Sequence, residues 1–201
     1  MNKLLLGAFV IITIASCGPT TQIVKTWKEP GATITASPDN KTLVIGMIKD
    51  ETSRRIVEDE LVSRIKSKAV ASYTLLSAQA ISSASNEPLN KVLNEGGFTH
   101  VLMMLLTDVQ DETYYVPGST SVYYGGYGSY YGYGAAYYSD PGYYTTDHNY
   151  FVETTVYSVN PDKLLWTSTT KSVNPSKLQT AVDGVADVVT YQMKEDGFIP
   201  K

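Results

Sequence analysis

The residues best suited to chemistry in this chain are its single cysteine and the small residues that precede it. Cys17 is the only cysteine, and it follows Ala15 and Ser16, whose small side chains let a peptidase approach the backbone. A positively charged start leads into an apolar run over residues 4–15, which is typical of an export signal and too short for a permanent membrane span. The pattern predicts a signal peptide over residues 1–16 with cleavage before Cys17.

The run Ile14–Cys17 resembles the lipobox of bacterial lipoproteins. This resemblance implies that acyl chains such as palmitate are attached to the sulfur of Cys17 and often to the new amino terminus. Two or three chains form a firm membrane anchor, because each buried methylene contributes about 0.8 kcal/mol. Gly18 in place of an acidic residue resembles lipoproteins of the outer membrane that face the periplasm, although the cell surface is the other location open to it. The alternative is an ordinary signal peptide or an unusual anchor helix.

Charge and cysteine content limit the partners of the mature protein. If Cys17 is acylated, no thiol remains for a disulfide, so stability in an oxidising compartment depends on the apolar core. The formal net charge is −4 and the sequence has no basic run, which argues against nucleic acid as a partner. The expected partners are the membrane, through the lipid on Cys17, and an envelope protein or the cell wall. The sequence leaves the oligomeric state open.

A polar cluster follows the first apolar strand pattern, where a helix is expected to begin. Open α/β sheets bind ligands at this edge, and the free N–H groups of a helix start favour anions. The candidate ligand-binding residues are Thr52, Ser53, Arg54 and Arg55. The alternative is structural, because both arginines stand close enough to Glu58 and Asp59 along a helix to form surface ion pairs.

The sequence shows no recognisable catalytic or metal-binding motif. No serine lies in a G-x-S-x-G turn, and no phosphate-binding G-x-x-x-x-G-K-[ST] loop occurs. His100 opens an expected buried strand, and His148 has no second histidine or cysteine near it that could complete a metal site. We therefore predict no catalytic residue, no metal and no cofactor. The alternative is a pair of carboxylates brought together from distant positions in the chain.

A tyrosine-rich and glycine-rich insert spans residues 114–148. The stretch from Tyr114 to Tyr150 holds 13 of the 16 tyrosines, and its glycine density excludes a stable helix. Tyrosine doublets recur every seven residues and form a candidate association surface. They are Tyr123, Tyr124, Tyr130, Tyr131, Tyr137 and Tyr138. The alternative is a passive low-complexity loop.

Apolar patterning predicts one mixed α/β domain over residues 41–201, preceded by a lipidated tether over residues 17–40 in which Gln22–Trp27 alternates like a short strand. The expected order is β-α-β-α-β, the insert, and then β-β-α, giving a mixed sheet of about five strands with three helices. The expected strands are residues 42–48, 73–76, 99–106, 150–159 and 164–173, and the expected helices begin near Ser53, Asn86 and Leu178. Leu61 and Leu105 are expected in the core.

From Trp27 to its end the chain resembles a family of small bacterial lipoproteins of unassigned function. The stretches that carry the resemblance are Lys41–Asp50, Thr52–Leu61, Ser72–Leu76, Glu112–Gly118 and Leu164–Ser168. The order of elements is also similar to the amino-terminal domain of TolB and to the periplasmic domain of the curli-export channel lipoprotein. The second likeness is one of topology, and a shared fold does not carry a function.

These observations predict a lipid-anchored, noncatalytic envelope protein that acts as an adaptor or binding module. One alternative, implied by the likeness to the curli exporter, is an accessory or pore-forming component of a secretion system. A second alternative is a hydrolase whose site the sequence does not reveal.

Overall fold

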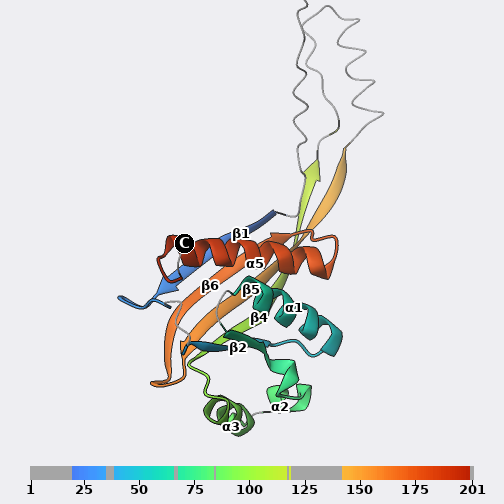
Figure 1. Cartoon of the computed structure of the whole chain (residues 1–201). Helices are drawn as coiled ribbons and strands as arrows, with labels where there is room; N and C mark the ends of the chain where they lie inside the picture. Colours follow the sequence, from blue (N-terminus) through green and yellow to red (C-terminus); the bar gives the residue numbers. More distant parts are fainter. Residues whose placement is uncertain are drawn as a thin grey trace, which may run out of the picture.

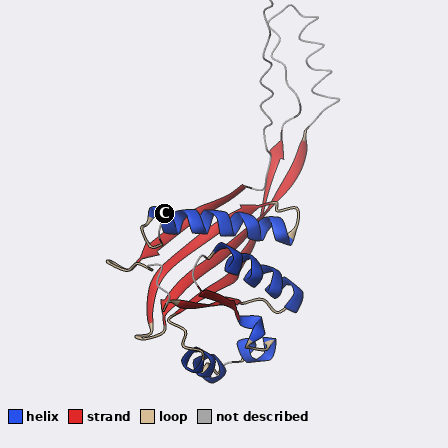
Figure 2. Ribbon diagram, in the orientation of Figure 1, coloured by secondary structure: helices blue, strands red, loops and turns tan. Residues whose placement is uncertain are grey.

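The computed structural model describes residues 20–34, 39–65, 68–83, 85–116, 118 and 142–199. They form one six-stranded mixed sheet with the strand order β1-β6-β5-β4-β2-β3 and helices packed on it (Figures 1 and 2). The strands are β1 (Thr20–Lys28), β2 (Lys41–Gly46), β3 (Lys68–Ala71), β4 (His100–Val116), β5 (Tyr143–Ser158) and β6 (Lys163–Val173). The helices are α1 (Glu51–Arg64), α2 (Ala78–Ser82), α3 (Glu87–Glu95) and α5 (Leu178–Glu195). The predicted α/β class and mixed sheet are confirmed.

The parallel part of the sheet is centred on β2, which pairs with β3 on one side and β4 on the other. Leu43 and Val44 of β2 are fully buried, as expected for a strand covered on both faces. The strand predicted at residues 73–76 is displaced, because β3 ends at Ala71 and a 3-10 turn, η1, occupies Ser72–Thr74. The backbone turns there because its polar groups bind a buried ion pair of α1.

β1 lies in the stretch that sequence patterning placed in a tether. It pairs antiparallel with β6 from Thr20 to Lys28 and forms an edge of the sheet. Pairing with β1 satisfies the backbone groups along that side of β6, which would otherwise form an open edge. α5 also approaches β1 closely at Gly184, where an added Cβ would lie 2.6 Å from Thr21 Oγ1. Thr20–Lys28, which was predicted to be part of the tether, is therefore a strand of the folded domain.

Helices cover the two faces of the sheet unequally. α1 and α5 lie on one face and enclose the larger core around Trp166 (Figures 1 and 2). α2 and α3 cover only the end of the other face, where Phe98 is buried. Leu105 points to this second face beyond the cover of α2 and α3, so its side chain is 43% exposed and its predicted place in the core is wrong.

β4 and β5 continue beyond the other strands as a two-stranded projection (Figures 1 and 2). We call its paired residues, Asp111–Val116 and Tyr143–His148, the arm. The insert predicted at residues 114–148 therefore begins and ends as strand. The reason is that the alternating polar pattern of β4 carries on into the tyrosines and pairs with the other end of the same insert.

Candidate functional site

The start of β1, the end of β6 and the base of the arm meet at one edge of the sheet. Thr20 pairs with Val173, Val173 pairs with Asn149, and Asn149 pairs with Gln110 at the arm base. We call this the arm edge. Cys17 precedes Thr20 by three residues, which span at most about 11 Å of extended chain. This short spacing in the sequence tethers any group attached to Cys17 to the arm edge.

Asn174 joins the end of β6 to the arm base. Its backbone N–H donates to the carbonyl of His148 at 3.0 Å, and its side-chain oxygen accepts the backbone N–H of His148 at 2.8 Å. Its side-chain nitrogen donates to Asp147 Oδ1 at 2.6 Å. Asn174 has a φ of 46°, a left-handed conformation that asparagine tolerates better than most residues. These contacts fix the arm relative to the sheet.

Cross-strand polar pairs support the arm. The hydroxyl of Tyr114 donates to Asp147 at 2.7 Å, and His148 Nδ1 lies 2.7 Å from Asp111 Oδ1. Hydrogen bonds from Tyr114 and Asn174 lower the pKa of Asp147, while the same carboxylate raises the pKa of Tyr114. Asp147 is partly buried and its partners are exposed, so the arm base is a largely solvated polar surface.

The upper part of the arm is uncharged and aromatic. Tyr115 and Tyr144 pair across the strands with ring centroids 5.4 Å apart, and Tyr144 is 76% exposed. Tyr143 beside it is 62% exposed. The six predicted doublet tyrosines from Tyr123 to Tyr138 lie outside the described residues, as does Cys17.

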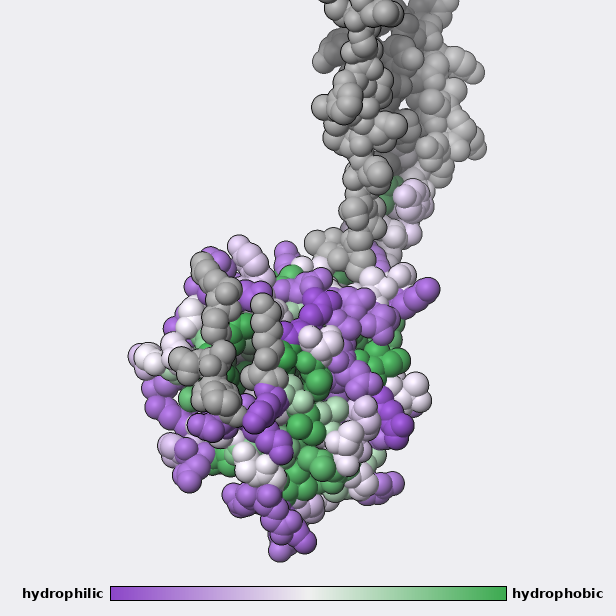
Figure 3. Space-filling view, in the orientation of Figure 1, coloured by the Kyte–Doolittle hydropathy of each residue, from purple (hydrophilic) through white to green (hydrophobic). Residues whose placement is uncertain are grey.

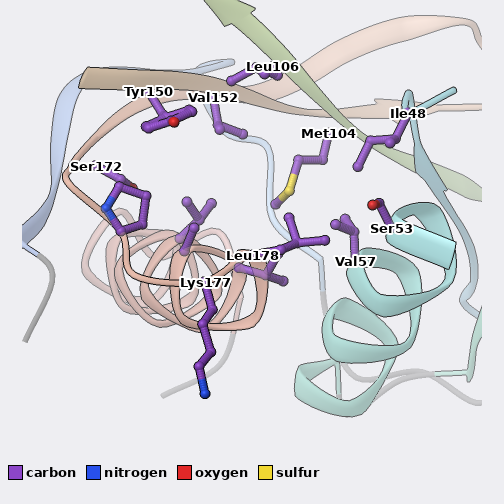
Figure 4. A pocket seen from close by; sticks show the side chains of 14 residues that line it. Ile48, Ser53, Val57, Met104, Leu106, Tyr150, Val152, Ser172, Lys177 and Leu178 are labelled. Atoms are coloured by element: carbon purple, nitrogen blue, oxygen red, sulfur yellow. The ribbon is translucent and has the colours of Figure 1, made fainter. Parts of the chain in front are cut away.

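An apolar cavity of about 390 Å³ lies beside the arm edge, between α1, α5 and the sheet. We call it the wedge. Figure 4 shows side chains of β4 and β5, including Met104 and Val152, above the gap between the two helices. In the space-filling view of the whole molecule, apolar patches interrupt the polar surface of this side (Figure 3). The residues that define the wedge best are Ile48, Val57, Met104, Leu106, Val152 and Leu178.

The residues predicted to form an anion site at the start of α1 point to different sides of the helix. Asp50 caps α1 by accepting the backbone N–H of Ser53 at 2.8 Å, so the helix begins at Glu51, two residues before the start expected near Ser53. The side-chain hydrogen bond from Ser53 lowers the pKa of Asp50. Arg55 is exposed and pairs with Glu51 at 3.2 Å. Arg54 points inward, so these residues do not present one cationic surface.

Arg54 is fully buried, whereas its charge and its spacing from Glu58 predict an exposed side chain. Its Nε donates to Glu58 Oε1 at 2.9 Å, and one guanidinium nitrogen donates both to Ser72 Oγ and to the carbonyl of Leu76 at 2.9 Å. The sequence spacing does identify Glu58 as a partner, but it suggests an exposed pair. The signal for burial is that Arg54 stands three residues before Val57 and so lies on the helix face that buries Val57 and Leu61.

Glu58 is also fully buried and completes this network. Its Oε1 accepts the backbone N–H of Gly46 at 3.0 Å and the hydroxyl of Ser72 at 2.7 Å. Its Oε2 accepts the backbone N–H of Tyr73 at 2.8 Å. The ion pair therefore ties α1 to the end of β2 and to η1, and its polar atoms are occupied by the fold.

The histidines serve local contacts. His100 Nδ1 lies 2.9 Å from Thr99 Oγ1, and partial burial lowers the pKa of His100. Within the described part of the chain, no group of three or more histidine, cysteine, aspartate or glutamate side chains could hold a metal ion. No helix among these residues is long and apolar enough to cross a membrane.

Comparisons with known proteins give little similarity. No protein-family model matches the chain, and neither does any curated protein. Two solved structures of PelC dodecamers from Paraburkholderia phytofirmans, one of them a point variant, share 11% sequence identity with it. Their TM-scores are 0.46 and 0.45, the alignments cover 86% of this chain, and they cover 96% and 95% of the PelC chains. Similarity at this level supports no inference about the present chain.

Proposed function

We propose that the protein is a lipid-anchored, noncatalytic component of the bacterial cell envelope. In this proposal it is an adaptor whose arm binds another envelope protein or the cell wall. The supporting observation is the arm edge, where the start of β1 and the base of the arm are neighbours in one sheet. The resemblance of Ile14–Cys17 to a lipobox supplies the anchor.

In this proposal the arm lies close to the membrane surface. An anchor at Cys17 holds the arm edge close to the membrane, so the arm extends along or toward the lipid surface. Tyrosine is favoured at membrane interfaces, where its ring is apolar and its hydroxyl stays hydrated. The exposed Tyr143 and Tyr144 belong to the described part of this surface. We propose the outer membrane, on its periplasmic side, as the location.

Replacing Cys17 with serine tests the anchor. The variant is expected to accumulate as an unprocessed precursor that incorporates no labelled palmitate, because the acylated sulfur is missing. The measurement is metabolic labelling followed by membrane fractionation, with Ser16→Ala, which keeps a small residue before the cleavage site, as the matched control. A Cys17→Ser protein that is still labelled and processed would contradict the proposed anchor.

Shortening the arm tests the binding module. Exchanging residues 113–146 for a short Gly/Ser turn is expected to keep the melting temperature within a few degrees, since the arm side chains described above contribute to neither core and loop closure depends weakly on length. Binding is expected to be lost in at least one of three assays: self-association, retention on peptidoglycan and retention on liposomes. Tyr191→Ser removes an exposed tyrosine from α5 and serves as the control. A shortened protein that binds like the parent in all three assays would make the arm a passive expansion.

A second candidate function is an accessory or pore-forming part of a secretion system. It is favoured by the arm. β4 pairs with β2 only as far as Met104, but it continues to pair with β5 as far as Val116, so the arm leaves strand edges beyond the rest of the sheet. Backbone groups along such a strand edge can pair with another chain. Sedimentation of the lipidated protein in detergent separates the two functions. A stable ring of many copies would support the secretion component, and a monomer or dimer would exclude it.

A further inference from the structure

The wedge exists because α1 and α5 are joined at one end and separate toward the other. Arg64 near the end of α1 forms an ion pair with Asp187 of α5. Leu61 and Val189, which stand close to these two residues in the sequences of α1 and α5, are buried in the same core. Both helices begin at the side of the arm edge, where the space between them stays open over the sheet (Figure 4).

Two leucines in the wedge are placed for burial but are not buried. Leu178 begins the apolar stripe that continues through Val182 and Val185, yet it is 41% exposed, while both valines are buried. Leu106 lies on the helix-covered face of β4, two residues after the buried Met104, and is 47% exposed. The stripes on both walls therefore extend past the point at which the helices meet. An apolar guest between the helices would complete their burial.

The walls of the wedge are mainly apolar, and Tyr150 adds one hydroxyl to their lining. The other polar side chains at the wedge are engaged elsewhere or extend away from it. Ser53 donates its hydroxyl to Asp50 at 2.7 Å, and the hydroxyl of Ser172 lies 2.9 Å from that of Thr21. Lys177 borders the wedge, but its side chain extends away from the other labelled residues (Figure 4). Walls of this kind suit a hydrocarbon chain, and a volume of about 390 Å³ falls in the range of small-molecule sites.

We propose that one acyl chain of the lipid on Cys17 occupies the wedge. This inference rests on the proposed anchor. Thr21 touches Ser172 in the wedge wall, and Cys17 precedes Thr21 by four residues, which span at most about 14 Å. Because the wedge lies beside the arm edge, a chain that starts at Cys17 can enter it while the remaining chains stay in the bilayer. The bound chain would set the orientation of the domain on the membrane.

Photo-crosslinking in the full-length lipidated protein tests this placement. Benzoylphenylalanine replaces Leu178 in the wedge or, as the control, Tyr191, which is exposed on the same helix. Cells are irradiated, and the α5 peptide is analysed by mass spectrometry for adducts with the acylated Cys17 peptide. The expected result is an adduct from the Leu178 probe and none above background from the Tyr191 probe. Ala181→Phe, which fills the wedge, is expected to abolish the adduct while the protein stays folded and acylated.

The alternative outcomes overturn the inference in different ways. An adduct with free phospholipid would show that the wedge takes a bilayer lipid, and a Leu178 probe that gives no lipid adduct would show that it takes no acyl chain. The intact mass of the protein reports acylation separately. A protein that is acylated but gives no Cys17 adduct overturns this inference alone, whereas a protein without acyl mass overturns the proposed anchor as well.

Discussion

Replacing Glu58 with alanine is expected to lower the free energy of unfolding by about 3 to 5 kcal/mol, because it leaves a buried guanidinium without its charge partner. Arg54 and Glu58 are both fully buried and 2.9 Å apart. The substitution also leaves the backbone N–H groups of Gly46 and Tyr73 without their acceptor. Since small domains are stable by roughly 5 to 15 kcal/mol, the loss is a large part of the total.

Urea unfolding followed by circular dichroism measures this effect. Arg55→Ala is the matched control on the same helix, because its ion pair with Glu51 is exposed and is expected to contribute less than about 1 kcal/mol. The double substitution of Arg54→Met with Glu58→Leu is expected to recover part of the loss, since an apolar pair removes the isolated charge. Recovery should be incomplete because Gly46 and Tyr73 still lack an acceptor. A Glu58→Ala protein as stable as Arg55→Ala would contradict a buried ion pair at this position.

Elements that carry their own apolar pattern could be predicted from the sequence. The continuous apolar run of β2 reports burial on both faces, and the stripe of α5 reports a helix on a sheet. The turn between β5 and β6 follows from Asn160 and Pro161. Each of these patterns is local, so the neighbouring residues are enough to identify it.

Features that depend on distant partners could not be predicted in the same way. β1 is a strand because β6 lies beside it, and only the weak alternation of Gln22–Trp27 pointed to this. β3 ends before the predicted position because Glu58 binds the backbone of Tyr73. Charge alone suggests that Arg54 is exposed, since two of the groups that compensate its burial, in Ser72 and Leu76, lie eighteen and more positions away in the sequence.

The candidate site shows the same division. The tyrosine spacing marks residues 114–148 as unusual, but the pairing of Tyr115 with Tyr144 depends on the two ends of the insert meeting. The wedge has no sequence signature at all, because it is the space left between two helices. Its nearest trace in the sequence is Leu178, which the apolar stripe places in the core and the structure leaves partly exposed.

Leu61→Asp is expected to unfold the domain. The Leu61 side chain is 3% exposed and packs in the core that α1 and α5 form over the sheet. An aspartate at this position would bury a carboxylate that has no ion-pair partner in the core. The cost is several kcal/mol, against a total stability of about 5 to 15 kcal/mol. Thermal unfolding measured by circular dichroism should therefore show either no cooperative transition or a strongly lowered melting temperature.

Leu105→Asp is the control that makes this test specific to the fold. It introduces the same charge in place of the same residue type, but Leu105 is 43% exposed on the face that α2 and α3 leave open. Its carboxylate stays hydrated, so the loss of stability is expected to be about 1 kcal/mol or less, as for most surface substitutions. Equal destabilisation by the two variants would mean that Leu105 is covered in the folded protein. A Leu61→Asp protein that melts like the parent would mean that α1 does not pack on the sheet through this residue.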